Sequence, residues 1–248
     1  ITLDEGRQAE LVDFPGTYSL SSNNEAEAEV GKHLLTRKFD LIINIIDASQ
    51  LSRSLPLTLE LMELGIPMVI ALNMVDEASR KGIDIDSEKL SEILGIPVQT
   101  TIASKNIGVK DLFRKVKDTL EHPDPSRKRS LTCQKDVEKL IGELEGILSR
   151  EYPGKFNYPP RFLAIKLLED DDYYRDFVTG INGKVISEKL DRMHQKLVQL
   201  RGKPQDSVMV LERSAIAMDI YNQVVQVGHP KVDWRGKIDS LIMHKFGG

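Results

Sequence analysis

The sequence is poor in cysteine, in net positive charge and in long apolar runs. Its single cysteine, Cys133, cannot form an internal disulfide, so a reducing compartment is expected. The formal net charge of −4 argues against a nucleic-acid-binding surface, which needs a basic excess. No apolar stretch approaches the roughly 18 residues of a membrane span, and no charged-then-apolar leader opens the sequence. We therefore expect a soluble, cytosolic-type chain without a nucleic-acid partner.

The first half of the 248 residues alternates apolar runs of strand length with amphipathic runs of helix length. Strands are predicted over residues 8–13, 40–47, 67–73 and 97–101, and helices over 24–37, 51–64, 77–82, 86–94 and 109–120. This alternation is typical of a parallel sheet with helices on both faces. The runs 40–47 and 67–73 are continuously apolar, so both are predicted to be strands buried on both faces.

The strand pattern ends at the Pro-rich segment 122–126, and only helical patterns follow. Helices are predicted over residues 132–150, 160–170, 172–179, 184–200 and 205–227. We therefore predict an α/β domain over residues 1–121, an all-α domain over 131–228 and a tail over 229–248. The acidic run Glu169–Asp172 is interpreted as a solvated helix end rather than as a metal site.

The strongest candidate for a ligand site follows the apolar run 67–73. That run ends in Asn73, and Asp76 comes three residues later. In parallel sheets the ligand crevice lies outside the carboxyl ends of the strands. One carboxylate there can accept two parallel hydrogen bonds from the ring N–H and the exocyclic amine of guanine, whereas adenine offers no such pair. The alternative is a plain turn, since Asn and Asp are common after strands.

A second motif, D-x-x-G, is formed by Asp13, Phe14, Pro15 and Gly16 at the end of the first predicted strand. In phosphate-binding switches the Asp of this motif holds a Mg²⁺-bound water, and the Gly amide donates to the terminal phosphate. Glycine lets the backbone come close and pivot when that phosphate leaves. Taken alone, the motif is also a common turn.

The third element is the segment Thr101–Lys105, which follows the last predicted strand. Its small residues would let a backbone N–H near Ile102, Ala103 or Ser104 reach the guanine carbonyl oxygen. The three motifs each follow a predicted strand, in the order that a guanine-nucleotide switch requires. Their joint occurrence is far more specific than any one of them and predicts guanine-nucleotide binding.

The sequence resembles the cytosolic region of FeoB, the bacterial ferrous iron transport protein, over most of its length. The matching stretches are residues 11–20 (LVDFPGTYSL), 45–49 (IIDAS), 61–66, 71–76, 82–86 (GIDID) and 234–239 (WRGKID). Met74 stands where Ras-like N-K-x-D motifs carry Lys, and Asn-Met-x-Asp is the form of this family. The last stretch resembles the segment that leads into the family's membrane domain.

This resemblance implies a P-loop-type G domain followed by a helical domain similar to a GDP-dissociation inhibitor. It implies a slow GTPase that binds GTP or GDP with Mg²⁺, with K⁺ in those members that carry a P-loop Asn. It also implies a C-terminal membrane permease as partner, at the cytoplasmic face of the bacterial inner membrane, and leaves a homo-oligomer open. The residues expected to bind nucleotide are Asp13 (also holding Mg²⁺ through water), Phe14, Pro15, Gly16, Asn73, Met74, Val75, Asp76, Ile102, Ala103 and Ser104.

The departure from the family is the absence of the Walker A loop, G-x-x-x-x-G-K-[ST], and of the first switch. Only 12 residues precede Asp13, which is too few to hold them. We therefore expect the sequence to be a piece of a longer chain, and expect these residues alone to bind nucleotide poorly and to be inactive. No catalytic group can be named, because Thr17 and Tyr18 follow the D-x-x-G motif where Ras-like proteins have Gln.

Two rival functions remain open. In the first, the protein is a non-catalytic interaction module, in which the helical half docks a partner and the nucleotide site is vestigial. The other rival is a translation-type or ribosome-assembly GTPase, and the net charge of −4 speaks against its RNA partner.

Overall fold

The computed structural model describes residues 8–21, 25–122, 132–154, 158–182 and 184–230. The first part contains α1 (Glu25–Thr36), β1 (Ile42–Asp47), η2 (Ala48–Gln50), α2 (Leu51–Glu63), β2 (Met68–Asn73), α3 (Val75–Arg80), β3 (Ile83–Ile85), α4 (Ser87–Leu94), β4 (Val98–Thr101), η3 (Ala103–Lys105) and α5 (Val109–Glu121). The second contains α6 (Lys135–Glu151), α7 (Pro160–Leu168), α8 (Asp172–Asn182), α9 (Lys184–Arg201), α10 (Gln205–Val224) and β5 (Val225–Val227). None of the helices within these ranges is long and apolar enough to cross a membrane.

The central sheet is parallel, with the strand order β1-β2-β4. Its register aligns the ends of the strands, since Asp47 pairs with Asn73 and Asn73 pairs with Thr101. The parallel sheet predicted from the sequence is therefore confirmed. The alignment also means that the loops after the three strands leave the sheet at one edge, where their side chains can meet.

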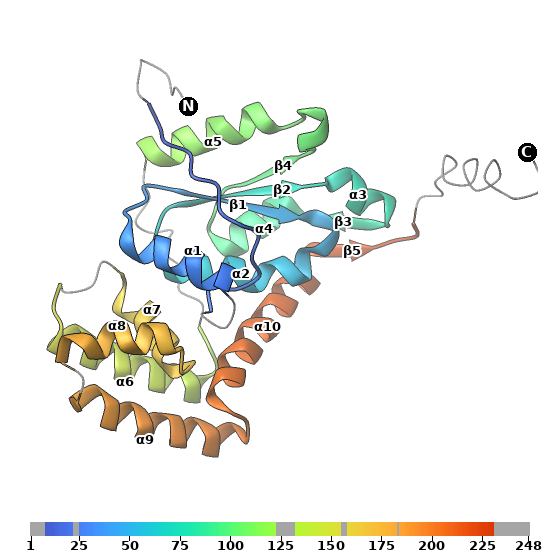
Figure 1. Ribbon diagram of the computed structural model, residues 1–248. Coiled ribbons are helices and arrows are strands. Elements are labelled where there is room, and N and C mark those ends of the chain that lie inside the picture. Colours follow the sequence, from blue (N-terminus) through green and yellow to red (C-terminus); the bar gives the residue numbers. More distant parts are fainter. Residues whose placement is uncertain (1–7, 22–24, 123–131, 155–157, 183, 231–248) are drawn as a thin grey trace, which may run out of the picture.

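β2 is the middle strand and is buried on both faces, as predicted. Met68, Ile70 and Leu72 belong to the large apolar core that includes α2 and α4. Val69 and Ala71 point the other way, into a smaller cluster with α5. Figure 1 shows α5 on one side of the sheet and α2 with α4 on the other. Successive β2 side chains face opposite helical layers, so every position is covered, which explains why its sequence is a continuous apolar run.

The prediction that the run 40–47 is buried on both faces is wrong for β1. Ile46 is buried, but Ile45 is 70% exposed. β1 is an edge strand of the described sheet, and α5 covers Leu41 and Ile43 only in part. An apolar run of this length therefore did not distinguish an edge strand from a central one, because both carry β-branched residues on both faces.

The segment 8–13 also differs from the prediction, because it forms no strand beyond an isolated bridge at Gln8. A strand is stable only when a neighbouring strand takes up its backbone groups. Phe14, the residue that follows this segment, packs against His33 of α1 and against Phe39, with ring centroids 5.9 and 5.8 Å apart.

A small second sheet was missed by the sequence prediction. β5 pairs antiparallel with β3, so that Val225–Val227, predicted as the end of a helix, are a strand. Two backbone bonds fasten this strand, from Asp86 N–H to the Val224 carbonyl and from the Gly228 N–H to the Gly82 carbonyl. β-branched Val225 and Val227 favour the extended form once a partner strand is present.

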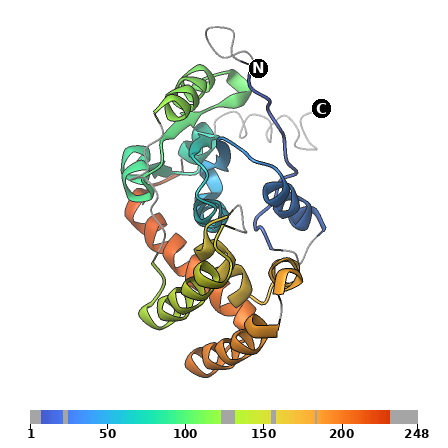
Figure 2. The same ribbon diagram turned by 90° about the vertical axis from the view of Figure 1, so that its left-hand side faces the viewer.

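The five helices predicted for the second half are all present, with ends shifted by a few residues. Helices α6 to α9 gather at one end of the molecule, and α10 runs from them to the sheet (Figures 1 and 2). α10 packs against α2 and α4, and the apolar core is continuous across both parts. The acidic run 169–172 is not the solvated helix end that was predicted, because Glu169 and Asp171 are buried.

One backbone position should be intolerant of any side chain. Gly108 has φ 76°, and a Cβ there would lie 2.2 Å from the Thr100 carbonyl oxygen. We expect Gly108→Ala to lower the free energy of unfolding by about 2–4 kcal/mol. Gly142 in α6 is the matched control, because nothing lies within 4 Å of its added Cβ. Gly142→Ala should stabilise by roughly 0.5–1 kcal/mol; equal effects of the two changes in urea titrations would contradict this.

Candidate functional site

The carboxyl edge of the sheet is held together by the Asn73 side chain. Its Oδ1 accepts hydrogen bonds from the Thr101 hydroxyl at 3.1 Å and from the Ala103 backbone N–H at 3.0 Å. The register places Asn73 beside Thr101, so a short side chain can span the two strand ends. The loop after β4 is thereby fixed relative to the loop after β2.

A left-handed turn at Met74 carries the chain from β2 into α3. Met74 has φ 60° and ψ 34°, which is uncommon for a residue with a side chain and costs of the order of 1 kcal/mol. The turn leaves Met74 42% exposed, while Val75 packs against the core. Asp76 therefore falls in the first turn of α3, and its Oδ1 accepts the Glu77 backbone N–H at 3.1 Å.

The other oxygen of Asp76 contacts a residue that the sequence prediction left out of the site. Lys105 Nζ donates to Asp76 Oδ2 at 2.6 Å. The side chains are 57% and 32% exposed, so the pair faces solvent. The hydrogen bond from Lys105, and then its charge, hold the pKa of Asp76 below its usual value. Lys105 directly follows the predicted residues Ala103 and Ser104, and that proximity was the available signal.

The loop after β4 is a preformed turn. Ile102 and Ile107 bridge it with two backbone hydrogen bonds of 3.0 and 3.2 Å, and Asn106 takes a left-handed conformation at φ 54°. Ala103 and Ser104 lie in the short helix η3 at its tip and are exposed. Together with Asn73, Met74 and Asp76, these residues form what we call the carboxyl-edge site.

The D-x-x-G motif is exposed for most of its length. Asp13, Pro15 and Gly16 are exposed, and a Cβ added at Gly16 would meet nothing within 4 Å. Among the described residues, no hydrogen bond or ion pair joins Asp13 to Asn73 or Asp76. Nor do the described ranges contain a group of three or more His, Cys, Asp or Glu side chains suited to a metal ion. Hydrogen bonds thus join two of the three motifs directly, those of Asn73–Asp76 and Thr101–Lys105.

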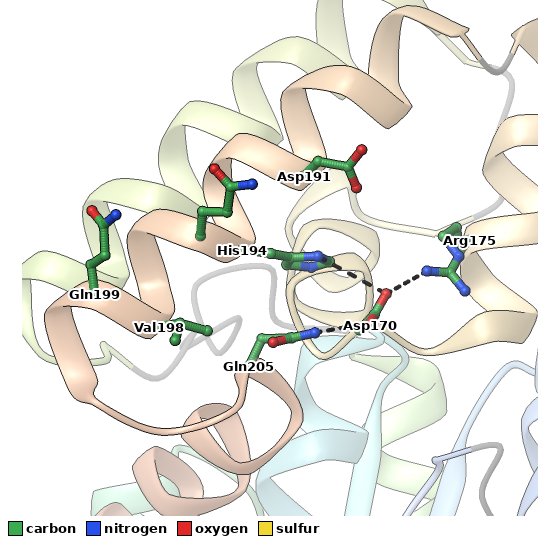
Figure 3. A pocket seen from close by; sticks show the side chains of 8 residues that line it. Asp170, Arg175, Asp191, His194, Val198, Gln199 and Gln205 are labelled. Carbon is green, nitrogen blue, oxygen red and sulfur yellow. Dashed lines mark hydrogen bonds and ion pairs between the residues drawn. The ribbon is translucent and has the colours of Figure 1, made fainter.

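A polar hollow of about 560 Å³ lies elsewhere, between α8, α9 and the start of α10. Asp170 is at its centre and accepts from Arg175 at 2.6 Å and from Gln205 at 3.0 Å, with His194 4.0 Å away (Figure 3). His194 also contacts the Leu167 carbonyl at 2.8 Å and is buried, so its ring is held by the helices around it. The carboxylate is already paired with neighbouring side chains, so the hollow is a structural junction between helices.

Comparisons with known proteins match both halves of the chain. The family model described as ferrous iron transport protein B matches residues 1–116, and the model of the FeoB cytosolic helical domain matches residues 134–226. The Fe(2+) transporter FeoB of Legionella pneumophila (strain Lens) is 33% identical over 246 residues, covering 96% of this chain. The corresponding protein of Staphylococcus aureus (strain MSSA476) is 32% identical over 248 residues. This chain spans 30% and 35% of those two proteins.

Solved structures agree with the family matches. A GDP-bound mutant of the S. thermophilus FeoB G domain superposes with a TM-score of 0.75 at 28% identity, over 86% of this chain and 80% of that one. The cytosolic domain of L. pneumophila FeoB superposes with a TM-score of 0.68 at 30% identity, over 86% and 79%. The fold is therefore that of a parallel-sheet G domain followed by a helical domain. The chain belongs to the FeoB family of ferrous iron transport proteins.

The pairing of Asp76 with Lys105 predicts a change in titration. Because the folded-state pKa of Asp76 is lowered, the ion pair contributes stability at neutral pH and loses it as pH falls through that pKa. Lys105→Met should raise the pKa of Asp76 toward its ordinary value, as measured by carboxyl ¹³C NMR. Lys81→Met, a change at another exposed lysine near α3, should leave it unchanged. An unchanged Asp76 titration in Lys105→Met would show that the pair does not persist in solution.

Proposed function

We propose that this chain is the cytosolic part of a guanine-nucleotide-binding protein, and that the carboxyl-edge site recognises the base. The observation that carries the proposal is that Asn73 Oδ1 accepts two hydrogen bonds, from the Thr101 hydroxyl and the Ala103 N–H. These bonds hold the Ala103 loop beside the Asp76 carboxylate. The GDP-bound state of the S. thermophilus relative supports the same ligand class.

The chemistry of the site fits guanine. Asp76 presents a partly exposed carboxylate that would accept from the ring N1–H and the exocyclic amine together. The exposed backbone at Ala103 and Ser104 would donate to the guanine carbonyl oxygen. The exposed Met74 side chain would cover one face of the ring. Lys105 would have to share Asp76 with the base or withdraw from it when nucleotide binds.

The phosphate end is proposed from fewer residues. Asp13 would hold Mg²⁺ through a water molecule, and the Gly16 amide would face the terminal phosphate, with Phe14 and Pro15 between them. Gly16 has open space around it, which suits a close approach by a phosphate. The remaining contacts, including those to Mg²⁺ and to K⁺, would come from a Walker A loop and the nucleotide itself.

The proposed reaction is slow hydrolysis of GTP to GDP. Thr17 and Tyr18 follow the D-x-x-G motif, and neither has the side-chain amide with which the Gln of Ras-like proteins orients water. In the whole protein, nucleotide state would regulate ferrous iron uptake through a C-terminal permease at the cytoplasmic face of the bacterial inner membrane. The helical domain would bias the nucleotide cycle by its differential contacts with the two states.

The alternative is a non-catalytic interaction module with a vestigial nucleotide site. The GDP affinity of an N-terminally extended form that carries its own Walker A loop distinguishes the GTPase from the interaction module. Affinity for GDP in the micromolar range or better, about −8 kcal/mol, would favour the GTPase. Residues 1–248 alone should bind GDP at best in the high micromolar range, roughly −5 to −6 kcal/mol.

The base-reading role of Asp76 gives a specific prediction. In the extended form, Asp76→Asn replaces an acceptor by an amide N–H that faces the guanine donors. GTP affinity should fall by about a hundredfold or more. Xanthosine triphosphate carries a carbonyl in place of the guanine amine, so its affinity should rise.

Competition between GTP, ATP and xanthosine triphosphate measures the effect. Asp84→Asn is the matched control, because Asp84 lies in β3 of the second sheet and is not one of the carboxyl-edge site residues. An Asp76→Asn protein that still prefers GTP would remove the base-reading assignment.

The helical half should slow nucleotide release. Deleting residues 131–248 from the extended form is expected to speed GDP dissociation several-fold, because the helices no longer favour the GDP-bound arrangement. Deleting only residues 229–248 is the control and should leave the rate unchanged. Stopped-flow release of a fluorescent GDP analogue gives both rates, and equal rates in the full and shortened forms would exclude this role.

A further inference from the structure

A group of charged side chains is buried where α2 meets the helical half. Lys166 of α7 is 0% exposed and Glu60 of α2 is 1% exposed. Glu169, at the end of α7, and Arg213 of α10 are also buried, as is Glu63 of α2. We call these residues the interdomain charge cluster. Buried charges are costly unless they are paired, so the pairing of each one can be followed through the cluster.

The contacts form a chain across the two halves. Lys166 Nζ bonds to Glu60 Oε1 and, at 3.0 Å, to Glu169 Oε2. Arg213 bonds to Glu169 Oε1 and lies 3.8 Å from Glu60 Oε1. Burial alone would raise the pKa of Glu60, but the charges of Lys166 and Arg213 lower it below its ordinary value, so the carboxylate is ionised. By contrast, burial raises the pKa of Glu63 to about 7.

One oxygen of Glu60 faces away from these cations. Glu60 Oε2 accepts the backbone N–H of Leu20 at 2.9 Å, and Leu20 is itself 1% exposed. Leu20 lies four residues after Gly16, at the end of the segment that begins with the D-x-x-G motif. A single carboxylate therefore joins this segment to two helices of the other domain.

The turn that carries Glu169 is fixed from several sides. Asp170, with φ 59°, is held by Arg175 of α8 and Gln205 of α10, and His194 of α9 lies beside it (Figure 3). Glu169 is thus presented to Lys166 and Arg213 by a junction of three helices. Lys166 and Arg213 therefore bond to a residue whose neighbour in sequence, Asp170, is bonded to two further helices.

We propose that Glu60 is a positioning residue for residues 13–20, and that the interdomain charge cluster couples the position of this segment to α7 and α10. This inference rests on the proposed function, in which the segment moves with the terminal phosphate of the nucleotide. When Leu20 N–H leaves Glu60, the carboxylate loses a charge-assisted hydrogen bond, and its pairing with Lys166 and Arg213 readjusts. The coupling is reciprocal, so the helical domain in turn favours one position of the segment.

The first test uses residues 1–248 without nucleotide and measures amide hydrogen exchange. Lys166→Met changes a helical-domain residue that bonds to Glu60 Oε1, whereas the Leu20 N–H bonds to Oε2. Compared with the unchanged protein, the Leu20 amide of this variant should exchange at least about tenfold faster, after any change in the sheet amides of Val69 and Ile70 has been divided out. Lys196→Met, at an exposed lysine of α9, is the control and should change neither.

A merely structural cluster predicts a different outcome. Exchange at Leu20 and in the sheet would then rise in the same proportion, or Leu20 would not change, and either result overturns the proposal. If Lys166→Met does not fold, the double variant Glu60→Gln/Lys166→Met removes both charges and leaves a neutral acceptor. Exchange at Leu20 should again rise at least about tenfold more than exchange in the sheet, relative to the unchanged protein, because a neutral oxygen accepts a hydrogen bond more weakly.

The second test needs no substitution. In the N-terminally extended form, replacing GDP by a non-hydrolysable GTP analogue should change exchange at Leu20 and in α7 and α10 together. A change at Leu20 without any change in α7 and α10 would refute the coupling. If the extended form binds no guanine nucleotide, the proposed function fails by itself, and the exchange result on residues 1–248 still decides whether Glu60 and Lys166 position Leu20.

Discussion

The hydrogen bonds accepted by Asn73 are the interaction on which the candidate site depends. They are possible only because the parallel register sets the end of β2 beside the end of β4. One amide oxygen then satisfies both the Thr101 hydroxyl and the Ala103 N–H, and the loop of η3 is fixed before any ligand arrives. Leaving either donor without a partner would cost about 1–3 kcal/mol where it is shielded from water. Preorganisation of this kind lowers the ordering cost of binding.

The second constraint is the position of α2 between the sheet and the helical half. Its apolar face packs under β2, and its acidic residues Glu60 and Glu63 lie toward α7 and α10. Breaking one partner of a buried ion pair costs about 3–5 kcal/mol, whereas replacing both partners can be neutral. The cluster is therefore poor evidence for stability as such, and its contact with Leu20 is the feature that gives it a role in coupling.

The sequence predicted the parts of this fold that follow from local pattern. β2 was recognisable because both of its faces are covered, and α5 because Leu112 and Val116 recur at helical spacing. The failures all concern pairing between distant segments. Residues 8–13 have strand composition but pair with no strand in the described part of the chain, and Val225–Val227 became a strand because β3 lies beside them. Ile45 was predicted to be buried, and only the position of β1 at the sheet edge shows otherwise.

The candidate site was predictable in outline for the same reason. Asn73, Asp76 and Ala103 each follow a recognisable strand, so their meeting at one edge could be expected. Lys105 could not be assigned to Asp76 from the sequence, because the turn between Ile102 and Ile107 decides its direction. Likewise, the acidic run 169–172 looked solvated because its partners, Lys166 and Arg213, lie on separate helices.

The central claim is that this edge distinguishes guanine from adenine, and NMR titration of residues 1–248 tests it most directly. The residues proposed to read the base all lie in this chain, so GDP at millimolar concentration should shift the Asn73 side-chain amide and the backbone amides of Ala103 and Ser104. ADP at the same concentration should leave these signals in place. Equal shifts with both nucleotides, or GDP shifts confined to other parts of the chain, would contradict the account.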